Sequence, residues 1–101
     1  MPLGSRRGQV MKYVLRYDSP ENIDEDKLRA HFPAHRARWA TFQEQGSLLL
    51  IGPLADRHGA LAVFTSHEAA EQFATSDPFV LHGLVARWTI TAWHEALLDP
   101  L

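Results

Sequence analysis

The sequence predicts a single α+β domain whose elements follow one another in the order strand, helix, strand, strand, helix, strand. Three observations lead to this prediction. The chain has 101 residues, of which 46% are hydrophobic, enough for one modest core but not for two domains. Four short segments show the alternating or continuous apolar pattern of strands. Two longer segments place apolar residues at helical spacing.

The first half of the chain provides one strand and one interrupted helix. The strand is "MKYVLRY", residues 11–17, in which successive side chains alternate between two faces. Acidic residues at 24–26 suit the start of a helical region that Gly46 ends. Because a proline has no amide hydrogen, we expect Pro33 to divide this region. The prediction is a short helical turn at Lys27–His31 and a new helix that starts near Pro33.

The second half of the chain provides a hairpin, a helix and a last strand. The hairpin consists of "SLLLIGPL", residues 47–54, and "GALAVFT", residues 59–65, joined by a polar loop. The capping box at residues 65–68 begins the second helix, which runs up to Pro78. The segment "LVARWTITAW", residues 84–93, alternates again and is the fourth strand.

This element order is that of the ferredoxin-like fold, an antiparallel sheet with both helices on one face. The strands carry apolar side chains on both faces, so the uncovered face would expose a large apolar patch. We therefore expect a symmetric homodimer that packs sheet to sheet. The predicted domain spans residues 11–95, between an N-terminal tail or vector remnant at 1–10 and a C-terminal tail at 96–101.

Composition excludes several function classes. The formal charge of −2 is not gathered into blocks, so we expect no nucleic-acid partner and no membrane partner. The absence of cysteine excludes thiolate chemistry and favours a cytoplasmic location. No nucleotide-binding, serine-hydrolase or zinc-protease motif occurs. His31 and His35 are four residues apart, but Pro33 separates them, so we predict neither a metal nor another cofactor.

His35 is the residue whose position most needs an explanation. It shares a helical face with Trp39 and Phe42, which directs an ionisable imidazole toward the sheet. It is either a histidine at the core edge that bonds a backbone carbonyl or a functional group with a polar partner. Asp77 is the best candidate partner, because a carboxylate would orient the imidazole as a general base. Asp77 followed by Pro78 is also typical of the N-cap of a short helical turn, here one that closes at Gly83, and spacing alone favours this role.

The same helical face indicates where a ligand would bind. Arg38 lies beside His35, and Tyr17 faces the same side from the first strand, so both are candidate contacts for an oxyanion or carboxylate. Aromatic residues of the helix and the last strand would supply apolar walls. The Gly-Pro pair of the second strand either just ends that strand or forms another wall. The candidate ligand contacts are Tyr17, Arg38, Trp39, Phe42, Gly52 and Pro53, with Trp88 as a further wall.

With these residues in place, the chain resembles the YciI-like (YCII-related) family of small α+β proteins. The resemblance lies in the opening strand, in "FPAHRARWATFQEQGSLLLIGP", in "FTSHEAAEQFATSDPFV" and in a closing strand that ends at Trp93. It covers nearly all of Met11–His94. It implies a ferredoxin-like dimer of the α/β-barrel type. It also implies that the family's catalytic histidine and aspartate fall on His35 and Asp77, which favours a dyad over two separate structural roles.

Taken with these residues, the resemblance implies a cofactor-independent enzyme that acts on a small cyclic or phenolic molecule. His35, oriented by Asp77, would move a proton in an isomerase-like or lyase-like reaction. The alternative is a homodimeric module that binds or accompanies a small ligand without turning it over. In both cases the expected partners are a second copy of the chain and a small molecule.

Overall fold

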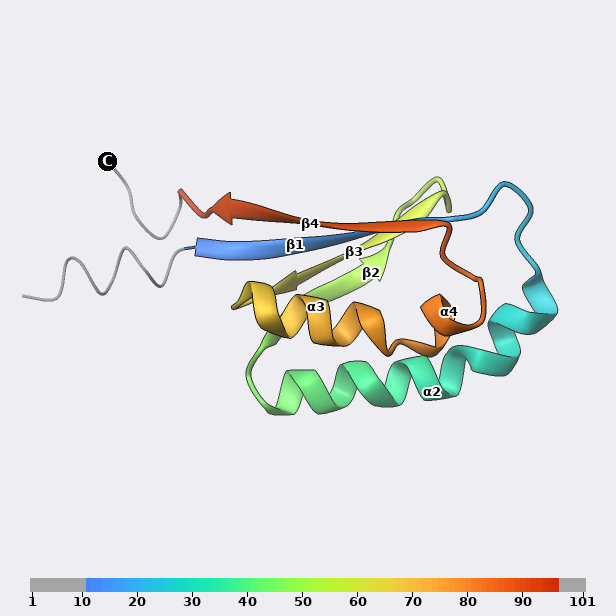
Figure 1. Ribbon diagram of the computed structural model, residues 1–101, viewed down its shortest axis with the longest axis horizontal. Helices are drawn as coiled ribbons and strands as arrows, with labels where there is room; N and C mark the ends of the chain where they lie inside the picture. The colour runs from blue at the N-terminus through green and yellow to red at the C-terminus, as the bar shows by residue number, and fades with distance from the viewer. Residues whose placement is uncertain (1–10, 97–101) are drawn as a thin grey trace, which may run out of the picture.

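The computed structural model describes residues 11–96, so the predicted tail at 1–10 and most of the one at 96–101 lie outside the described residues. Strands and helices follow the predicted order, with one additional helical turn before the last strand (Figure 1). The elements are β1 (Met11–Asp18), α2 (Glu25–Glu44), β2 (Leu48–Pro53), β3 (Gly59–Phe64), α3 (His67–Thr75), α4 (Pro78–Leu81) and β4 (Arg87–His94).

The four strands form one antiparallel sheet in the order β2-β3-β1-β4. The register places Tyr17 of β1 opposite Ala60 of β3 and opposite Trp88 of β4. Because side chains alternate along a strand, these residues share one face of the sheet. Figure 1 shows α2 and α3 side by side below this sheet, with α4 at one end. This arrangement confirms the predicted ferredoxin-like fold.

The core lies between this face and the helices. Leu15 and Phe64 from the sheet and Phe73 from α3 are fully buried and belong to one hydrophobic cluster. Ala70 and Ala74 are also fully buried, which lets the short helix α3 approach the sheet closely. The core therefore holds both helices against the same face.

The predicted helix break at Pro33 is wrong, because α2 continues through this residue for 20 residues in all. Asp24 caps its N-terminus and accepts a hydrogen bond from the amide of Lys27 at 3.1 Å. A proline at position 33 removes only the hydrogen bond to the carbonyl of Arg29, and both residues are exposed, so water can replace the lost donor. Figure 1 shows that the first turns of α2 are inclined to the rest, as expected near a proline.

The predicted last strand begins too early. Alternation suggested residues 84–93, whereas β4 begins at Arg87. Leu84 is buried, and Leu84 and Val85 lie in the connection before the strand. Their apolar character comes from packing in this connection rather than from a strand. Gly83 directly precedes them with φ +74°, a left-handed conformation that suits glycine.

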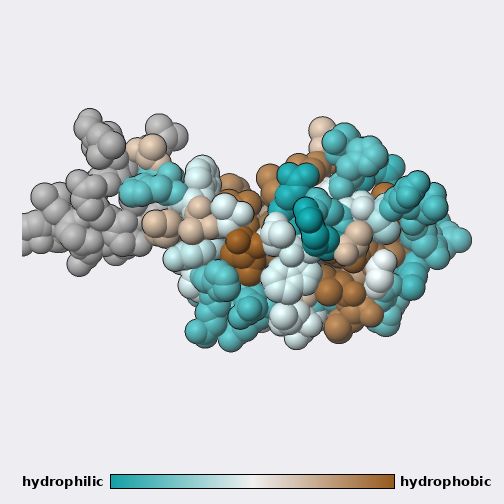
Figure 2. All heavy atoms as spheres, turned by 45° about the horizontal axis from the view of Figure 1, so that its top comes forward, coloured by the Kyte–Doolittle hydropathy of each residue, from teal (hydrophilic) through white to brown (hydrophobic). Residues whose placement is uncertain are grey.

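The second face of the sheet has no helix over it. Leu50, Leu61 and Trp93 are 66%, 37% and 47% exposed. The register places Leu61 and Leu50 beside Arg16, Val14 and Val63 on this face. Figure 2 shows apolar surface, in brown, in separate areas between polar side chains. Within residues 11–96, no helix is both long enough and apolar enough to cross a membrane.

Candidate active site

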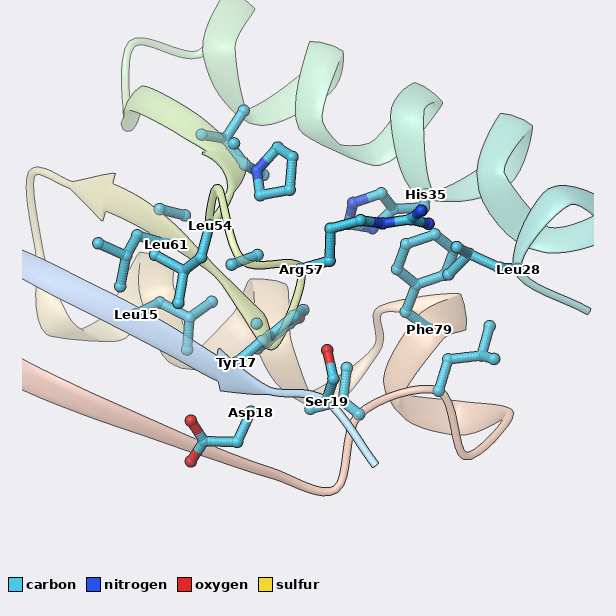
Figure 3. A pocket seen from close by; sticks show the side chains of 18 of the residues that line it. Leu15, Tyr17, Asp18, Ser19, Leu28, His35, Leu54, Arg57, Leu61 and Phe79 are labelled. Carbon is cyan, nitrogen blue, oxygen red and sulfur yellow. The ribbon is translucent and has the colours of Figure 1, made fainter. Parts of the chain in front are cut away.

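A cavity of about 660 Å³ lies between α2, the end of β1, the β2–β3 hairpin and α4 (Figure 3). Its volume is typical of sites for small molecules, which occupy about 300–1,000 Å³. Most of its lining is apolar, including Ile23, Leu28, Phe32, Leu54, Phe79 and Val85. His35, Asp18 and Arg57 are the side chains in the lining that can carry a charge. The cavity therefore suits a ligand with a large apolar part and few polar groups.

His35 lies near the middle of α2, with 6% of its surface exposed, and lines the cavity. Its ring stacks on Phe79 of α4 with centroids 4.0 Å apart and an interplanar angle of 10°. Trp39, one turn further along α2, meets it edge to face at 5.3 Å. These two contacts hold the plane of the imidazole in one orientation.

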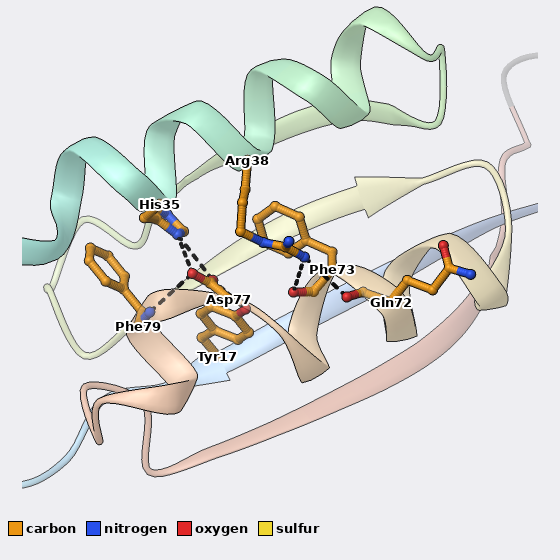
Figure 4. A network of polar contacts seen from close by, with 7 residues as sticks. All are labelled: Tyr17, His35, Arg38, Gln72, Phe73, Asp77 and Phe79. Carbon is orange, nitrogen blue, oxygen red and sulfur yellow. Dashed lines mark hydrogen bonds and ion pairs between the residues drawn. The ribbon is translucent and has the colours of Figure 1, made fainter.

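Asp77 is fully buried at the N-terminus of α4 and accepts three donors. His35 Nδ1 lies 2.8 Å from Oδ1 and 3.0 Å from Oδ2. The hydroxyl of Tyr17 donates to Oδ2 at 2.6 Å, and the amide of Phe79 donates to Oδ1 at 3.1 Å. Figure 4 shows these side chains around the carboxylate. Asp77 is thus both a helix cap and the partner of His35, two roles that the sequence presented as alternatives.

These three donors supply the hydrogen bonds that a buried carboxylate requires. With Nδ1–H of His35 donating its hydrogen bond to Asp77, Nε2 is the ring nitrogen available to a ligand in the cavity. Burial, together with the nearby charge of Asp77 and the hydrogen bond to it, raises the pKa of Tyr17 far above its ordinary value. Tyr17 therefore stays a neutral phenol that donates to Asp77.

Arg38 lies outside the cavity lining, although it is close to His35 in sequence. Its Nη2 donates to the carbonyls of Gln72 and Phe73, both at 3.1 Å (Figure 4). These carbonyls belong to the last turn of α3, where no amide of the helix can reach them. Arg38 therefore ties α2 to the end of α3, a few residues before Asp77.

The other predicted ligand contacts divide into two groups. Trp39, Tyr17, Gly52 and Pro53 line the cavity. Phe42 lies outside the lining and packs in the core, where its ring is 5.3 Å from that of Phe73. Trp88 likewise packs against the core.

Two further residues, Arg57 and Asp18, line the cavity and were not predicted from the sequence. Arg57 lies in the polar loop between β2 and β3, and Asp18 ends β1. Binding residues are often carried by loops on a rigid scaffold, so the charged "DRHG" of this loop was the available signal. Among the described residues, no three histidine or acidic side chains gather in a way that could hold a metal ion.

The fold and the site define a class of protein: a small ferredoxin-like domain whose buried histidine–aspartate pair borders a ligand-sized apolar cavity. The chain belongs to the YCII-related domain family, whose model matches residues 11–94. No curated protein sequence matches it significantly.

Solved structures of similar fold include the following two. One is 5-chloro-2-hydroxyhydroquinone dehydrochlorinase (TftG) from Burkholderia phenoliruptrix AC1100, in complex with 2,5-dihydroxybenzoquinone. It is 20% identical, with a TM-score of 0.51, over 82% of this chain and 92% of the dehydrochlorinase. The other is a conserved protein from Methanosarcina mazei Go1, 11% identical, with a TM-score of 0.50, over 88% of this chain and 96% of that one. At these identities the likeness shows the fold alone.

Proposed function

We propose that this protein is an enzyme that moves a proton on a small cyclic or phenolic molecule without a cofactor. The observation that carries the proposal is the contact between His35 Nδ1 and the buried carboxylate of Asp77, at 2.8 Å, beside an apolar cavity. A histidine oriented by a carboxylate is a common general base. Binding energy would come from the apolar walls, and chemistry from the imidazole.

The proposed step begins with a ligand proton near Nε2 of His35. Nε2 takes this proton, and the bonding pair stays on the ligand as an enolate or phenolate. Asp77 stabilises the resulting imidazolium through the Nδ1 hydrogen bond and itself remains ionised. The imidazolium then returns the proton to another ligand atom in an isomerisation. In an elimination, the electron pair instead expels a leaving group.

The likeness to a dehydrochlorinase is consistent with the elimination form of this proposal. Removal of hydrogen chloride requires a base that takes one proton while chloride leaves. The similar structure holds 2,5-dihydroxybenzoquinone, a ring that would also suit the size and apolar character of the present cavity. We therefore include this quinone, with phenols and lactones, among the compounds to be tested.

A thermal-shift panel followed by turnover measurements tests the proposal. A compound that binds only the folded protein raises its melting temperature. We expect His35→Gln to abolish conversion of such a compound while largely keeping its binding. His67→Gln is the matched control, because His67 is exposed on α3 and lies outside the cavity lining. Full turnover by the folded His35→Gln variant would refute the base assignment. Binding without any turnover by the parent would favour the alternative, a ligand-binding module.

We also propose that the chain forms a homodimer through the sheet face that no helix covers. Exposed apolar side chains on this face, such as Leu50 and Leu61, support this proposal. We expect Leu61→Glu to convert a dimer into a folded monomer, as measured by light scattering. Leu81→Glu is the control, because Leu81 is exposed on α4 rather than on the sheet. A parent protein that is already monomeric at micromolar concentration would contradict the proposal.

A cytoplasmic location remains a prediction from the cysteine-free composition.

A further inference from the structure

Arg57 gives the cavity a permanent positive charge. Within residues 11–96, no other lysine or arginine lines the cavity, and most of the lining is apolar. Figure 3 shows its side chain extending from the β2–β3 loop toward α2, on the side where His35 lies. A guanidinium in such surroundings is suited to an anionic group on a ligand.

The loop holds the backbone of Arg57 in a fixed place. Arg57 has φ 65°, a left-handed conformation that is unfavourable for residues other than glycine. Its amide donates to the carbonyl of Leu54 at 2.9 Å. The amide of His58 donates to the side chain of Asp56 at 2.9 Å, and the carbonyl of His58 accepts from Ser19 at 3.0 Å. The side chain of Arg57 therefore borders the cavity from a well-anchored base.

The present partner of Arg57 is weakly held. Its Nη2 lies 3.3 Å from both carboxylate oxygens of Glu25, at the start of α2. The two side chains are 69% and 50% exposed. Water and salt screen such a pair strongly, so it contributes little stability. An anionic group of a ligand in the cavity can therefore replace Glu25 at the guanidinium of Arg57.

The carboxylate of Asp18 does not oppose an anion in the cavity. Asp18 already accepts a hydrogen bond from Arg16 at 2.9 Å and another from Arg87 at 3.3 Å. These arginines hold the pKa of Asp18 below its ordinary value, and the hydrogen bond from Arg16 has the largest effect. The negative charge of Asp18 is therefore compensated by arginines of the sheet. Arg57 is the positively charged side chain that can bind an anion in the cavity.

We propose that Arg57 determines ligand specificity by leaving Glu25 and binding an anionic oxygen group on the ring of the ligand. The apolar part of that ligand would lie beside His35, so the inference rests on the proposed ligand site but concerns recognition rather than proton transfer. A carboxylate can accept two parallel hydrogen bonds from a guanidinium, and a phenolate oxygen can accept one or two. Neutral rings of the same size would lack this charge-assisted contact.

Benzoate and benzyl alcohol test the proposal, because they have similar shapes and differ in charge. Their affinities would be measured by NMR titration at one ionic strength. The affinity for 4-nitrophenolate, a third ligand, would be measured in the same way to distinguish recognition of a phenolate from recognition of a carboxylate. We expect the parent to prefer benzoate and Arg57→Gln to lower benzoate affinity about tenfold or more, as for a lost charge-assisted hydrogen bond. Benzyl alcohol binding should not change. Glu25→Gln should strengthen benzoate binding, because it removes the competing carboxylate.

Arg36→Gln is the matched control, since it removes the same charge from an exposed position of α2 outside the cavity lining. It should bind both compounds as the parent does. A parent that does not prefer either anion to benzyl alcohol, or an Arg57→Gln variant that keeps the preference, overturns the proposal. His35→Gln separates this outcome from a failure of the enzyme proposal. It should keep the preference for the anion even if no turnover is ever found.

Discussion

Alkaline pH should destabilise this protein through Tyr17. The hydroxyl of Tyr17 is buried and donates to Asp77 at 2.6 Å, so its pKa in the folded state lies far above its ordinary value. In the unfolded chain the same phenol ionises near pH 10, at roughly the value for free tyrosine. Above that pH the unfolded state binds fewer protons than the folded state. Stability from this group is therefore complete below about pH 10 and falls as the pH rises.

The magnitude follows from one proton per molecule. A single group of this kind lowers the free energy of unfolding by up to about 1.4 kcal/mol for each pH unit above about pH 10. At pH 11 its contribution is thus a loss of about 1.4 kcal/mol. Tyr17→Phe removes this proton from both states. At neutral pH it should also lose about 1.5–3 kcal/mol, as for a hydrogen bond to a charged group.

Urea unfolding of the parent and of Tyr17→Phe, measured at several values from about pH 8 to pH 11, tests this reasoning. Groups common to both proteins cancel in the difference between their stabilities. We expect this difference to shrink steadily above about pH 10. Tyr13→Phe is the matched control, because Tyr13 is on the same strand but has no contact with Asp77. The Tyr13→Phe variant retains Tyr17, so its free energy of unfolding should show the loss at alkaline pH that Tyr17 causes. A difference that stays constant with pH would refute the Tyr17–Asp77 assignment.

Three further predictions concern the same structure. Asp77→Ala should lower the free energy of unfolding by about 3–5 kcal/mol in urea titrations, because it leaves buried donors without an acceptor and removes a helix cap. A loss below about 1 kcal/mol would contradict this network. Gly59→Ala should destabilise by about 2 kcal/mol or more, since a Cβ there would lie 2.2 Å from the carbonyl oxygen of Tyr17. Gly52→Ala, which has nothing within 4 Å of its added Cβ, is the control and should change the melting temperature far less. Arg38→Gln should lower stability by about 1–3 kcal/mol through the freed carbonyls at the end of α3, while ligand affinity in NMR titrations changes little.

Much of the fold could be predicted because its signals are local. Alternation marked β1, continuous apolar runs marked the hairpin, and the capping box marked α3. The break expected at Pro33 did not occur, because a proline on an exposed helix face removes one hydrogen bond that water can replace. The early start of the last strand was likewise an error, because periodicity does not distinguish a strand from a buried connection.

The candidate site was only partly predictable. Helical spacing alone directed His35 toward the sheet, since residues three and four apart share a helix face. Arg38 follows the same rule but bonds to α3, because the end of this neighbouring helix offers two carbonyls that no helix amide reaches. Arg57 was missed, because the path of a loop across a cavity depends on contacts that no local pattern encodes.

The sequence by itself determined the element order, the buried side of α2 and the N-cap at Asp77, because each depends on residues within a few positions of one another. Only the tertiary structure decided that this cap also meets His35, 42 residues away, and Tyr17, 60 residues away. The fold brings β1, α2 and the start of α4 together around the carboxylate of Asp77, which is fully shielded from solvent. A buried carboxylate must find donors, and the fold supplies them from three separate elements.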